Sequence, residues 1–581
     1  MMKQAICRIG NPLFLGGTLS FALLTWVNQT IAFGVGTFIL PRSQTVNTVR
    51  ELVGWQYEIN IPHNGTDYWT FSMAAEYDRL FNAQRLADYL LNGSTISVIG
   101  SAYPSCQPTC GTTVLADYFG LPRDFKSTVL AHPALAQFLI DFDLYYGIDS
   151  LVPGLYARLH MPLVYANWDL NLCEAVSVCG TDTFPAGYMA AVDVPRNDLP
   201  CSFREAMRGT TTFGDMKEPL AYGKILDRQT DIHIADLQAV VGYNIALADH
   251  YHAGFNFRVS APTGTANCQE FLFEPVIGNG HHWEIGAGFT GHYELPVCMD
   301  GGSLGIYVDS NVTHLCATET KRSYNFIHNG PGSRYMLLED IRHASSGLFF
   351  ADGMASSYQY SGLLVNAINR TTLCSTIRIP VQVDCVIKAA WNWSDLSIDL
   401  GYNFWYRSAE QLVCRERFPK NQYALKGDAQ IYGFTMADEQ PIALGATQHA
   451  ALLCGGQNNG NPSFTNANAD NPVTAYSTGI VPLTNLTAAD AAMLGLTQDP
   501  IATSRPPLLL SDKDIAIHSG LVPRGLSHKG FVHINYAWKN KHIMTPYLGM
   551  GAAIEYAHGS LCNNSGLRTW GIWIKGGFSR S

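Results

Sequence analysis

Residues 282–293, HWEIGAGFTGHY, alternate strictly between apolar and polar or small side chains. A period of two residues is the period of a β-strand, whose side chains point to opposite faces in turn. The run is twelve residues long. Strands of soluble domains are typically about five to six residues long, and a tilted strand that crosses a membrane needs about nine to eleven. This stretch therefore favours a sheet that spans a membrane.

The same alternation returns at 252–259 and at 396–407. Three charged residues lie inside these strands, always on the polar parity: Arg258, Asp399 and Arg407. A soluble β-sandwich would turn that parity to bulk water. A transmembrane barrel would turn it to a wet lumen and the apolar parity to lipid.

Composition favours the barrel. Charged residues make only 14% of the 581 residues, against about 25% in typical soluble domains. Aromatic residues make 11% and there are 53 glycines, as expected for alternating strands with aromatic girdles. The formal net charge is −10 and no basic stripe is present, so we expect no nucleic-acid partner.

The N-terminus has the features of a secretory signal peptide. Lys3 and Arg8 precede an apolar stretch at 13–27, and the small-residue site Thr30-Ile31-Ala32 follows it. A transmembrane anchor is the alternative, but the apolar stretch is shorter than the about 20 residues that a span needs. We expect cleavage after Ala32. An exported chain without helical spans is periplasmic, secreted or a barrel of the bacterial outer membrane.

The chain has 14 cysteines, which suits an oxidising compartment. Loss of the signal peptide would remove Cys7 and leave thirteen, so at least one thiol would lack a partner in the chain. The sequence does not give the connectivity. Three pairs in loop-like sequence are candidate disulfides: Cys106 with Cys110, Cys173 with Cys179, and Cys414 with Cys454.

We predict an all-β chain that folds into an antiparallel transmembrane β-barrel of about 14–18 strands, with long loops and a few short helices. A short helix is expected at 43–52, and His63-Asn64-Gly65 is expected to form a tight turn. The expected organisation is a signal peptide at 1–32, a segment in or at the lumen at 33–54, and the barrel at 55–581, with long insertions at 173–221 and 435–510.

Several stretches resemble bacterial outer-membrane porins, in particular porins of host-associated bacteria. They are PRSQTVNTVRELVGW, EPVIGNGHHWEIGAGFTGHYEL, WNWSDLSIDLGYNFWYR, YALKGDAQIYGF and the last three strands. The cysteine content is similar to that of the cysteine-rich major outer-membrane proteins of the chlamydial type. The chain departs from porins at its end, where Ser579-Arg580-Ser581 follows the outward-facing Phe578 instead of a terminal aromatic residue.

The resemblance implies a non-enzymatic channel without cofactors, through which small hydrophilic solutes diffuse. Its other partners would be outer-membrane lipid, the barrel-assembly machinery and, because porins are often trimers, further copies of the same chain. Two alternatives remain open for an exported, β-rich chain of this kind. One is a surface barrel acting as an adhesin or as an envelope protein cross-linked through its cysteines. The other is a soluble, secreted β-protein.

The polar parity supplies the candidate pore-lining residues. Both signs of charge are present, so we expect no strong ion selectivity. The alternative for each residue is simple pairing across strands. The candidates are Asp236, Asn256, Arg258, His282, Glu284, His292, Asp384, Lys388, Asp399, Arg407, Lys426 and Asp428.

Two further motifs suggest other chemistry. The histidine clusters at 249–252 and 281–282 could bind metal, but neighbouring residues of a strand point to opposite faces, so we expect no metal site there. The segment from Arg342 to Gly347 is similar to the H-x-S-N-G motif of the outer-membrane phospholipases, with His343 as base and Ser345 as nucleophile. Ser346 replaces the Asn of that motif, and we do not expect catalysis.

Overall fold

In the computed structural model, residues Ala32–Ser581 form one compact unit. The predicted signal peptide lies outside the described residues. These are 36–55, 59–63, 65–103, 112–299, 302–343, 358–427, 431–434, 441–443, 447–449, 451–455, 508–539 and 544–580.

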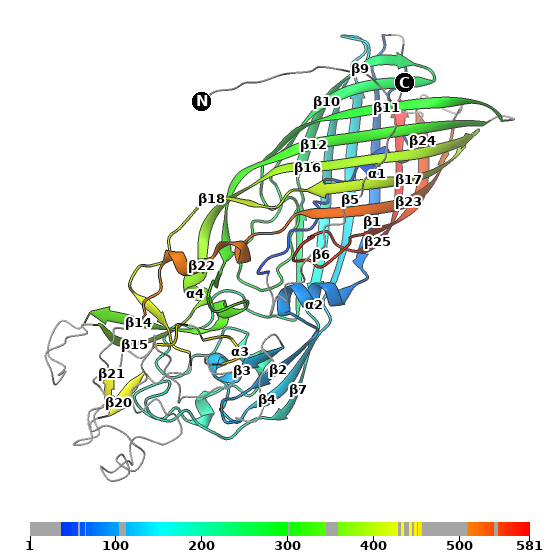
Figure 1. Cartoon of the computed structure of the whole chain (residues 1–581). Helices are drawn as coiled ribbons and strands as arrows, with labels where there is room; N and C mark the ends of the chain where they lie inside the picture. The colour runs from blue at the N-terminus through cyan, green and yellow to red at the C-terminus, as the bar shows by residue number, and fades with distance from the viewer. Residues whose placement is uncertain are drawn as a thin grey trace, which may run out of the picture. The chain divides into compact units, whose positions relative to one another are not determined.

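The main sheet closes into an antiparallel β-barrel (Figure 1). Among the described residues, twelve of the fourteen strands of this sheet form the ring, which closes through pairing of β1 with β25 and of β12 with β16. In chain order the ring strands are β1 (Tyr68–Leu80), β5 (Ala134–Gly147), β6 (Leu155–Asp169), β9 (Leu237–Ala248), β10 (Tyr251–Ala261), β11 (Glu284–Met299), β12 (Gly302–Ser323), β16 (Thr372–Trp393), β17 (Leu396–Arg407), β23 (Gly525–Ala537), β24 (Thr545–Tyr556) and β25 (Thr569–Arg580).

The fold class is confirmed, but the expected 14–18 strands were too many for the ring. The barrel was expected to begin at 55, but the described residues 55 and 59–61 are coil and bends, and the first ring strand begins at Tyr68. The porin-like stretch YALKGDAQIYGF (423–434) contributes β19 (Tyr423–Leu425) and β20 (Tyr432–Phe434), which belong to two small sheets outside the ring. Alternation is a local pattern and does not say which sheet a strand joins. The turn at His63 is confirmed, since the amide of Thr66 donates to the carbonyl of His63 and Gly65 has a φ of 80°.

The outer face of the ring is apolar and the inner face is polar. In β17, Leu400 is 65% exposed while its neighbour Asp399 is completely buried. In β10, Phe255 and Phe257 are exposed while Arg258 is buried. An apolar exterior around a polar interior is the arrangement of a barrel that spans a membrane. Among the described residues, no helix is long and apolar enough to cross a membrane.

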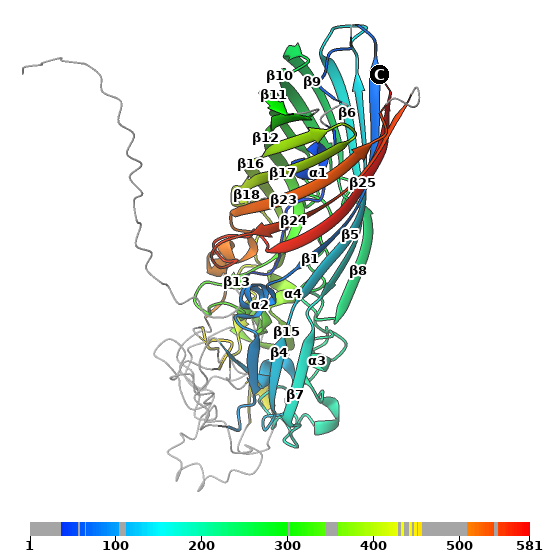
Figure 2. The same cartoon turned by 90° about the vertical axis from the view of Figure 1, so that its right-hand side faces the viewer.

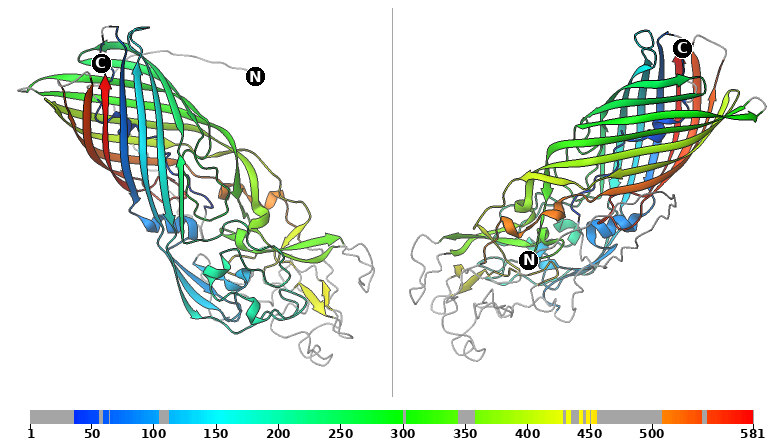
Figure 3. Two further views of the ribbon diagram at one scale, coloured as in Figure 1. Left: turned by 180° about the vertical axis from the view of Figure 1, so that it is seen from behind. Right: turned by 45° about the horizontal axis from the view of Figure 1, so that its top comes forward.

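Short turns connect the strands at one end of the barrel, and long connections leave from the other (Figures 1 and 3). The long connections together form the loop domain, which contains two small sheets and the helices packed on them. One sheet contains β2 (Thr95–Ile99), β3 (Thr113–Leu115), β4 (Lys126–Ala131) and β7 (Leu172–Val178); the other contains β14 (Leu337–His343), β15 (Tyr358–Asn366) and β19. The helices are α2 (Ala83–Leu91), α3 (Phe203–Ala206) and α4 (Ile368–Thr371).

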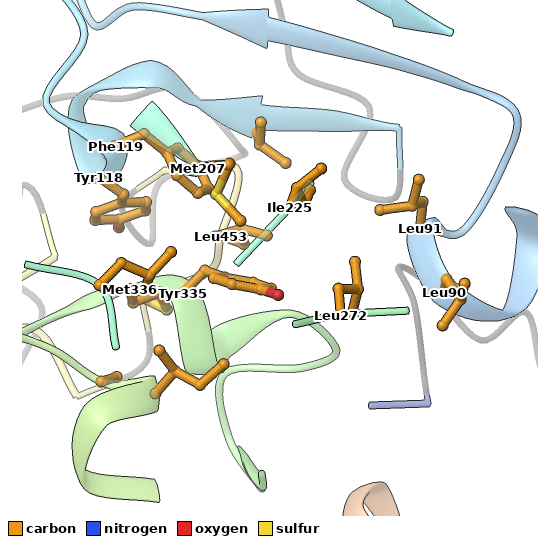
Figure 4. Packing of buried hydrophobic residues seen from close by; sticks show 14 of the residues in the cluster. Leu90, Leu91, Tyr118, Phe119, Met207, Ile225, Leu272, Tyr335, Met336 and Leu453 are labelled. Carbon is orange, nitrogen blue, oxygen red and sulfur yellow. The ribbon is translucent and has the colours of Figure 1, made fainter. Parts of the chain in front are cut away.

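Smaller pieces complete the described structure. β13 (Asn325–Phe326) pairs with β22 (Ile515–Ala516), and β20 (Tyr432–Phe434) pairs with β21 (Pro441–Ala443). β18 (Gln411–Arg415) pairs with β16 beside the ring. Buried side chains from distant connections meet in one apolar core, in which Tyr118, Phe119, Met207, Tyr335 and Met336 lie together (Figure 4).

Two of the expected disulfides are wrong, because Cys173, Cys179 and Cys414 are all free thiols. Cys173 lies in the extended strand β7 and Cys179 directly follows it. Six residues of extended chain, at about 3.3 Å each, separate their Cα atoms by about 20 Å, whereas a disulfide needs less than about 7 Å. Cys414 lies on β18, where its thiol faces the hydroxyl of Thr376. Cys106 and Cys110 lie outside the described residues.

Candidate functional site

The lumen of the barrel contains the chain's own N-terminal segment. We call residues 36–55 the luminal segment. Apart from half-buried Pro41 and Arg42, all its residues are buried. Its helix α1 (Thr48–Leu52) lies among the barrel strands in two perpendicular views (Figures 1 and 2). The side chain of Asn47 caps this helix by accepting from the amide of Arg50.

Charged residues of the barrel wall form hydrogen bonds with both ends of α1. At its N-terminus, a carboxylate oxygen of Asp384 accepts from the amide of Thr48 at 3.2 Å and from its hydroxyl at 3.0 Å. At its C-terminal end, the ammonium of Lys575 donates to the carbonyls of residues 50, 51 and 53 at 2.8–3.1 Å, and Lys388 donates to the carbonyl of Leu52 at 3.0 Å. An anion at the N-terminus and cations at the C-terminus stabilise a helix through its unpaired backbone groups and its dipole.

Ion pairs tie the side chains of α1 to three neighbouring strands. Arg50 pairs with Glu76 of β1 and with Asp141 of β5. Glu51 pairs with Arg158 of β6, with 3.1 Å between its carboxylate and the guanidinium. Burial alone would lower the pKa of Arg50, but the two carboxylates hold that pKa above its ordinary value. Arg50 therefore remains charged and bound to the wall.

Arg42 forms a second attachment. Its guanidinium donates to a carboxylate oxygen of Asp384 and to the side-chain oxygen of Asn403, both at 2.8 Å, and it lies 3.7 Å from Glu555. The wall residue Arg407 donates in return to the carbonyl of Leu40 at 2.7 Å. Both sides of the contact thus supply charged groups.

A third attachment lies where the wall is interrupted. β8 (Arg228–Ile234) and β9 both pair with β6, and residues 235–236 separate them. The hydroxyl of Ser43 donates to the carboxylate of Asp236 at 2.7 Å. The hydroxyl of Thr45 accepts from the amide of Asp236 at 3.0 Å and lies 3.2 Å from its carbonyl. Here the luminal segment satisfies backbone groups for which the described sheet pairing supplies no partner.

The structure brings five of the predicted pore-lining residues onto the luminal segment and leaves the others apart from it. The five contact residues are Asp236, Asp384, Lys388, Asp399 and Arg407. Another five are buried on the inner side of the barrel. Asn256 and Arg258 lie in β10, Glu284 and His292 lie in β11, and His282 lies just before β11.

Two predicted residues do not belong to the barrel wall as described. Lys426 directly follows β19 in the loop domain, where it is buried over the ring of Tyr188. Its assignment to the pore was wrong because the alternating pattern of 422–433 belongs to another sheet. Asp428 lies outside the described residues.

The adjacent residues His281 and His282 differ in burial, and His250 lies in the turn before β10, whereas His252 lies within β10. His281 is exposed while His282 is buried, and His250 is exposed while His252 is buried. His252 meets His292 across the β10–β11 pair, with their Nδ1 atoms in contact. The phospholipase-like residues Ser345 and Ser346 lie outside the described residues.

Sequence reasoning missed several charged residues that bind the luminal segment. Glu76, Asp141, Arg158 and Lys575 all lie on the inward parity of ring strands. Lys575 was detectable, because it is the single charge within the apolar stretch TWGIWIKGGF that closes the barrel. Their partners in the segment, Arg50 and Glu51, fall in the short helix expected at 43–52, but no local pattern pairs them with particular residues of the wall.

Little space remains around the luminal segment in the described structure. A cavity of about 60 Å³ lies beside Arg42, Gln44, Lys529 and Glu555. A second cavity of about 20 Å³ lies on the other side of the segment, beside Glu51 and Arg258. A water molecule needs about 10–15 Å³ of such space, so cavities of this size have room for a few water molecules.

Comparisons with known proteins give only distant similarities. No family model and no curated protein matches the sequence. An outer membrane channel from Pseudomonas putida F1 aligns at 8% identity over 90% of this chain and 97% of its own, with a TM-score of 0.31. A Pseudomonas aeruginosa FadL homologue aligns at 7% identity over 94% and 99%, with a TM-score of 0.25. A mutant of the TodX monoaromatic hydrocarbon channel aligns at 7% identity over 89% and 90%, with a TM-score of 0.27.

These TM-scores are all below 0.5, a level at which a similarity does not establish a common fold. The chain's own geometry is more informative: a closed antiparallel ring, an apolar exterior, and short turns at one end with long connections at the other. These are the features of outer-membrane barrels. The protein is an outer-membrane β-barrel whose polar interior binds its own N-terminal segment.

Proposed function

We propose that this protein is an outer-membrane channel through which small hydrophilic solutes diffuse, and that the luminal segment is its gate. One observation carries the proposal. The lumen is lined by charged and amide side chains, and what occupies it is a short segment held by ion pairs and hydrogen bonds to that lining. A lining of this kind can be hydrated when the segment leaves.

The solute class follows from the wall. Inward-facing Asp384, Asp399, Lys388, Arg158 and Lys575 would offer water and polar solutes hydrogen-bonding partners of both signs. Mixed rings of charge select weakly between anions and cations. We therefore expect a size filter for sugars, small acids and amines, with little preference for charge.

The gating role follows from how the segment is bound. The luminal segment belongs to no sheet among the described strands. It contacts the wall through side chains and through the ends of α1, so it can leave without breaking the strand ladders that close the ring. Each ion pair that it gives up is replaced by hydration of the same groups, which reduces the cost of opening.

The proposal is tested by swelling of liposomes that carry the refolded protein, in sugars of graded size. Arg42→Ala removes the contacts with Asp384 and Asn403, so it should speed swelling relative to the wild type, with a cutoff set by sugar size. Lys224→Ala is the matched control, because its ion pair with Glu270 lies in the loop domain, where the Glu270 side chain is 50% exposed. If neither wild type nor Arg42→Ala swells in the smallest sugar or conducts ions, the proposal is wrong.

An apolar solute is the second candidate. A cavity of about 20 Å³ in the loop domain is lined mostly by apolar side chains, among them Phe119, Met207, Phe213, Met216 and Tyr335. TodX, one of the compared channels, is named for monoaromatic hydrocarbons. Uptake of toluene into the same liposomes, without sugar-dependent swelling, would favour this candidate over the first.

A further inference from the structure

Three potential metal ligands meet on the loop domain. One ligand atom each from His328, His449 and Asp514 lies within 4.8 Å of the other two. The three residues are far apart in the sequence: His328 follows β13, His449 follows the 441–443 strand by six residues, and Asp514 ends a 3₁₀ turn before β22. No sequence motif joins them, so their approach is a result of the fold.

Specific backbone contacts hold the three segments together. β13 pairs with β22, and the amide of Ile327 extends this pairing by donating to the carbonyl of Asp514 at 2.8 Å. The buried side-chain amide of Asn329 donates to the carbonyls of His449 and Ala451 at 2.7 and 2.8 Å. The residues next to all three ligands are thus fixed to one another, which limits the entropy lost when the ligands bind one ion.

The side chains are also oriented. The amide and hydroxyl of Ser511 donate to one oxygen of Asp514 at 2.7 and 2.9 Å, which leaves the second oxygen for a ligand. Nδ1 of His449 is buried and has no hydrogen-bond partner among the described residues. The rings of His328 and His449 face each other with their centres 5.4 Å apart, and exposed His328 leaves the group open to solvent.

We propose that His328, His449 and Asp514 bind a single divalent transition-metal ion of the zinc class. Two imidazoles and one carboxylate are a donor set that zinc and its neighbours prefer over magnesium or calcium, which take mainly oxygen ligands. Donor atoms around tetrahedral zinc lie about 3.4 Å apart, given bonds of about 2.0–2.1 Å. Since the three ligand atoms lie within 4.8 Å of one another, each distance between them needs to shorten by at most about 1.4 Å to reach that spacing, with water as the fourth ligand.

The ion would fasten the loop domain at a defined place. His449 and Asp514 lie on either side of the sequence 456–507, and His328 belongs to the connection between β12 and β16. One ion would therefore clamp the two ends of that stretch to a neighbouring connection. This role is independent of the channel proposal, since none of the three residues contacts the luminal segment.

The test is titration of the refolded full-length protein in detergent with Co²⁺, whose visible absorption reports imidazole coordination, followed by displacement with Zn²⁺. We expect one Co²⁺ per chain at micromolar concentrations, and a melting temperature that is higher in Zn²⁺ than in EDTA. His328→Ala, His449→Ala and Asp514→Asn should each weaken binding at least tenfold. His132→Ala is the control, because His132 is exposed like His328 but lies outside the cluster.

Two results would overturn the proposal. One is absence of Co²⁺ binding up to millimolar concentration by protein whose barrel is folded. The other is binding that all three variants retain. His328→Ala keeps the test valid if the more buried variants misfold, because an exposed side chain can be truncated without disturbing the core.

Discussion

Replacing Arg50 with methionine should open the channel. Methionine keeps much of the length of the arginine side chain but removes the charge that binds Glu76 and Asp141. In the closed state, two carboxylates would then be buried against an apolar side chain. When the luminal segment leaves, both carboxylates regain water. The substitution thus destabilises the closed state selectively.

The size of the effect follows from the burial. Arg50 is 2% exposed and Glu76 is 3% exposed. Removing one partner of a buried ion pair costs about 3–5 kcal/mol. At about 1.4 kcal/mol per tenfold change, the ratio of open to closed channels should rise on the order of 100- to 4,000-fold. His160 lies 2.6 Å from Asp141 and partly compensates for the lost cation, so we expect the lower half of that range.

Single-channel recording in planar bilayers measures this ratio directly as open probability. Adding Glu76→Gln and Asp141→Asn to Arg50→Met removes the unpaired charges and should restore much of the closed population. An open probability that stays at the wild-type value in Arg50→Met, in protein that migrates as a folded barrel, would refute the reasoning. So would an equal increase in the triple variant, because it would show that packing and not charge holds the segment.

Three further substitutions probe other parts of the structure. Lys575→Met should also raise the open probability, by about tenfold or more, because it leaves three carbonyls of the luminal segment without their charged donor; the same recordings measure it. Leu400→Arg places a charge on the lipid face and should lower the stability of the folded barrel in vesicles by about 2–4 kcal/mol, whereas Leu151→Arg, in the exposed turn between β5 and β6, should change it little. Glu339→Gln should stabilise the loop domain at neutral and alkaline pH. Burial holds the pKa of Glu339 well above its ordinary value, with Lys426 opposing the shift, and neither carboxylate oxygen has a hydrogen-bond partner in the part of the chain that the structure describes. A raised carboxyl pKa gives stability that is present below the ordinary pKa and lost as pH rises through the raised value, at about 1.4 kcal/mol per unit of difference; melting of wild type between pH 4 and 8 should show this loss, and melting of Glu339→Gln should not.

The sequence predicts well which side chains of the ring strands face inward, because the alternation of side chains is a property of each strand by itself. Arg258, Glu284 and Asp399 were assigned to the inner face from alternation, and all three are buried there. The assignment of Lys426 was wrong for the same reason. Its short strand alternates like a ring strand, and only pairing with β14 shows that it belongs elsewhere. Pairing joins residues that are distant in the chain, so a local pattern cannot determine it.

The luminal segment shows why the interior of a barrel is harder to predict than its wall. A polar inner face is compatible with water, with a plug or with a second protein, because each satisfies the same hydrogen-bonding groups. Whether a segment of the chain fills the lumen depends on whether that segment offers charges complementary to those of the wall, at matching spacing. Arg42, Arg50 and Glu51 do so only when α1 lies with its N-terminus at Asp384 and its C-terminus at Lys575. That geometry requires β16 and β25 to be in place first. We therefore expect the segment to bind after the ring closes, so that in time-resolved refolding, protection of the Arg50 amide from hydrogen exchange should follow protection of the ring strands; simultaneous protection would mean that the barrel instead assembles around the segment.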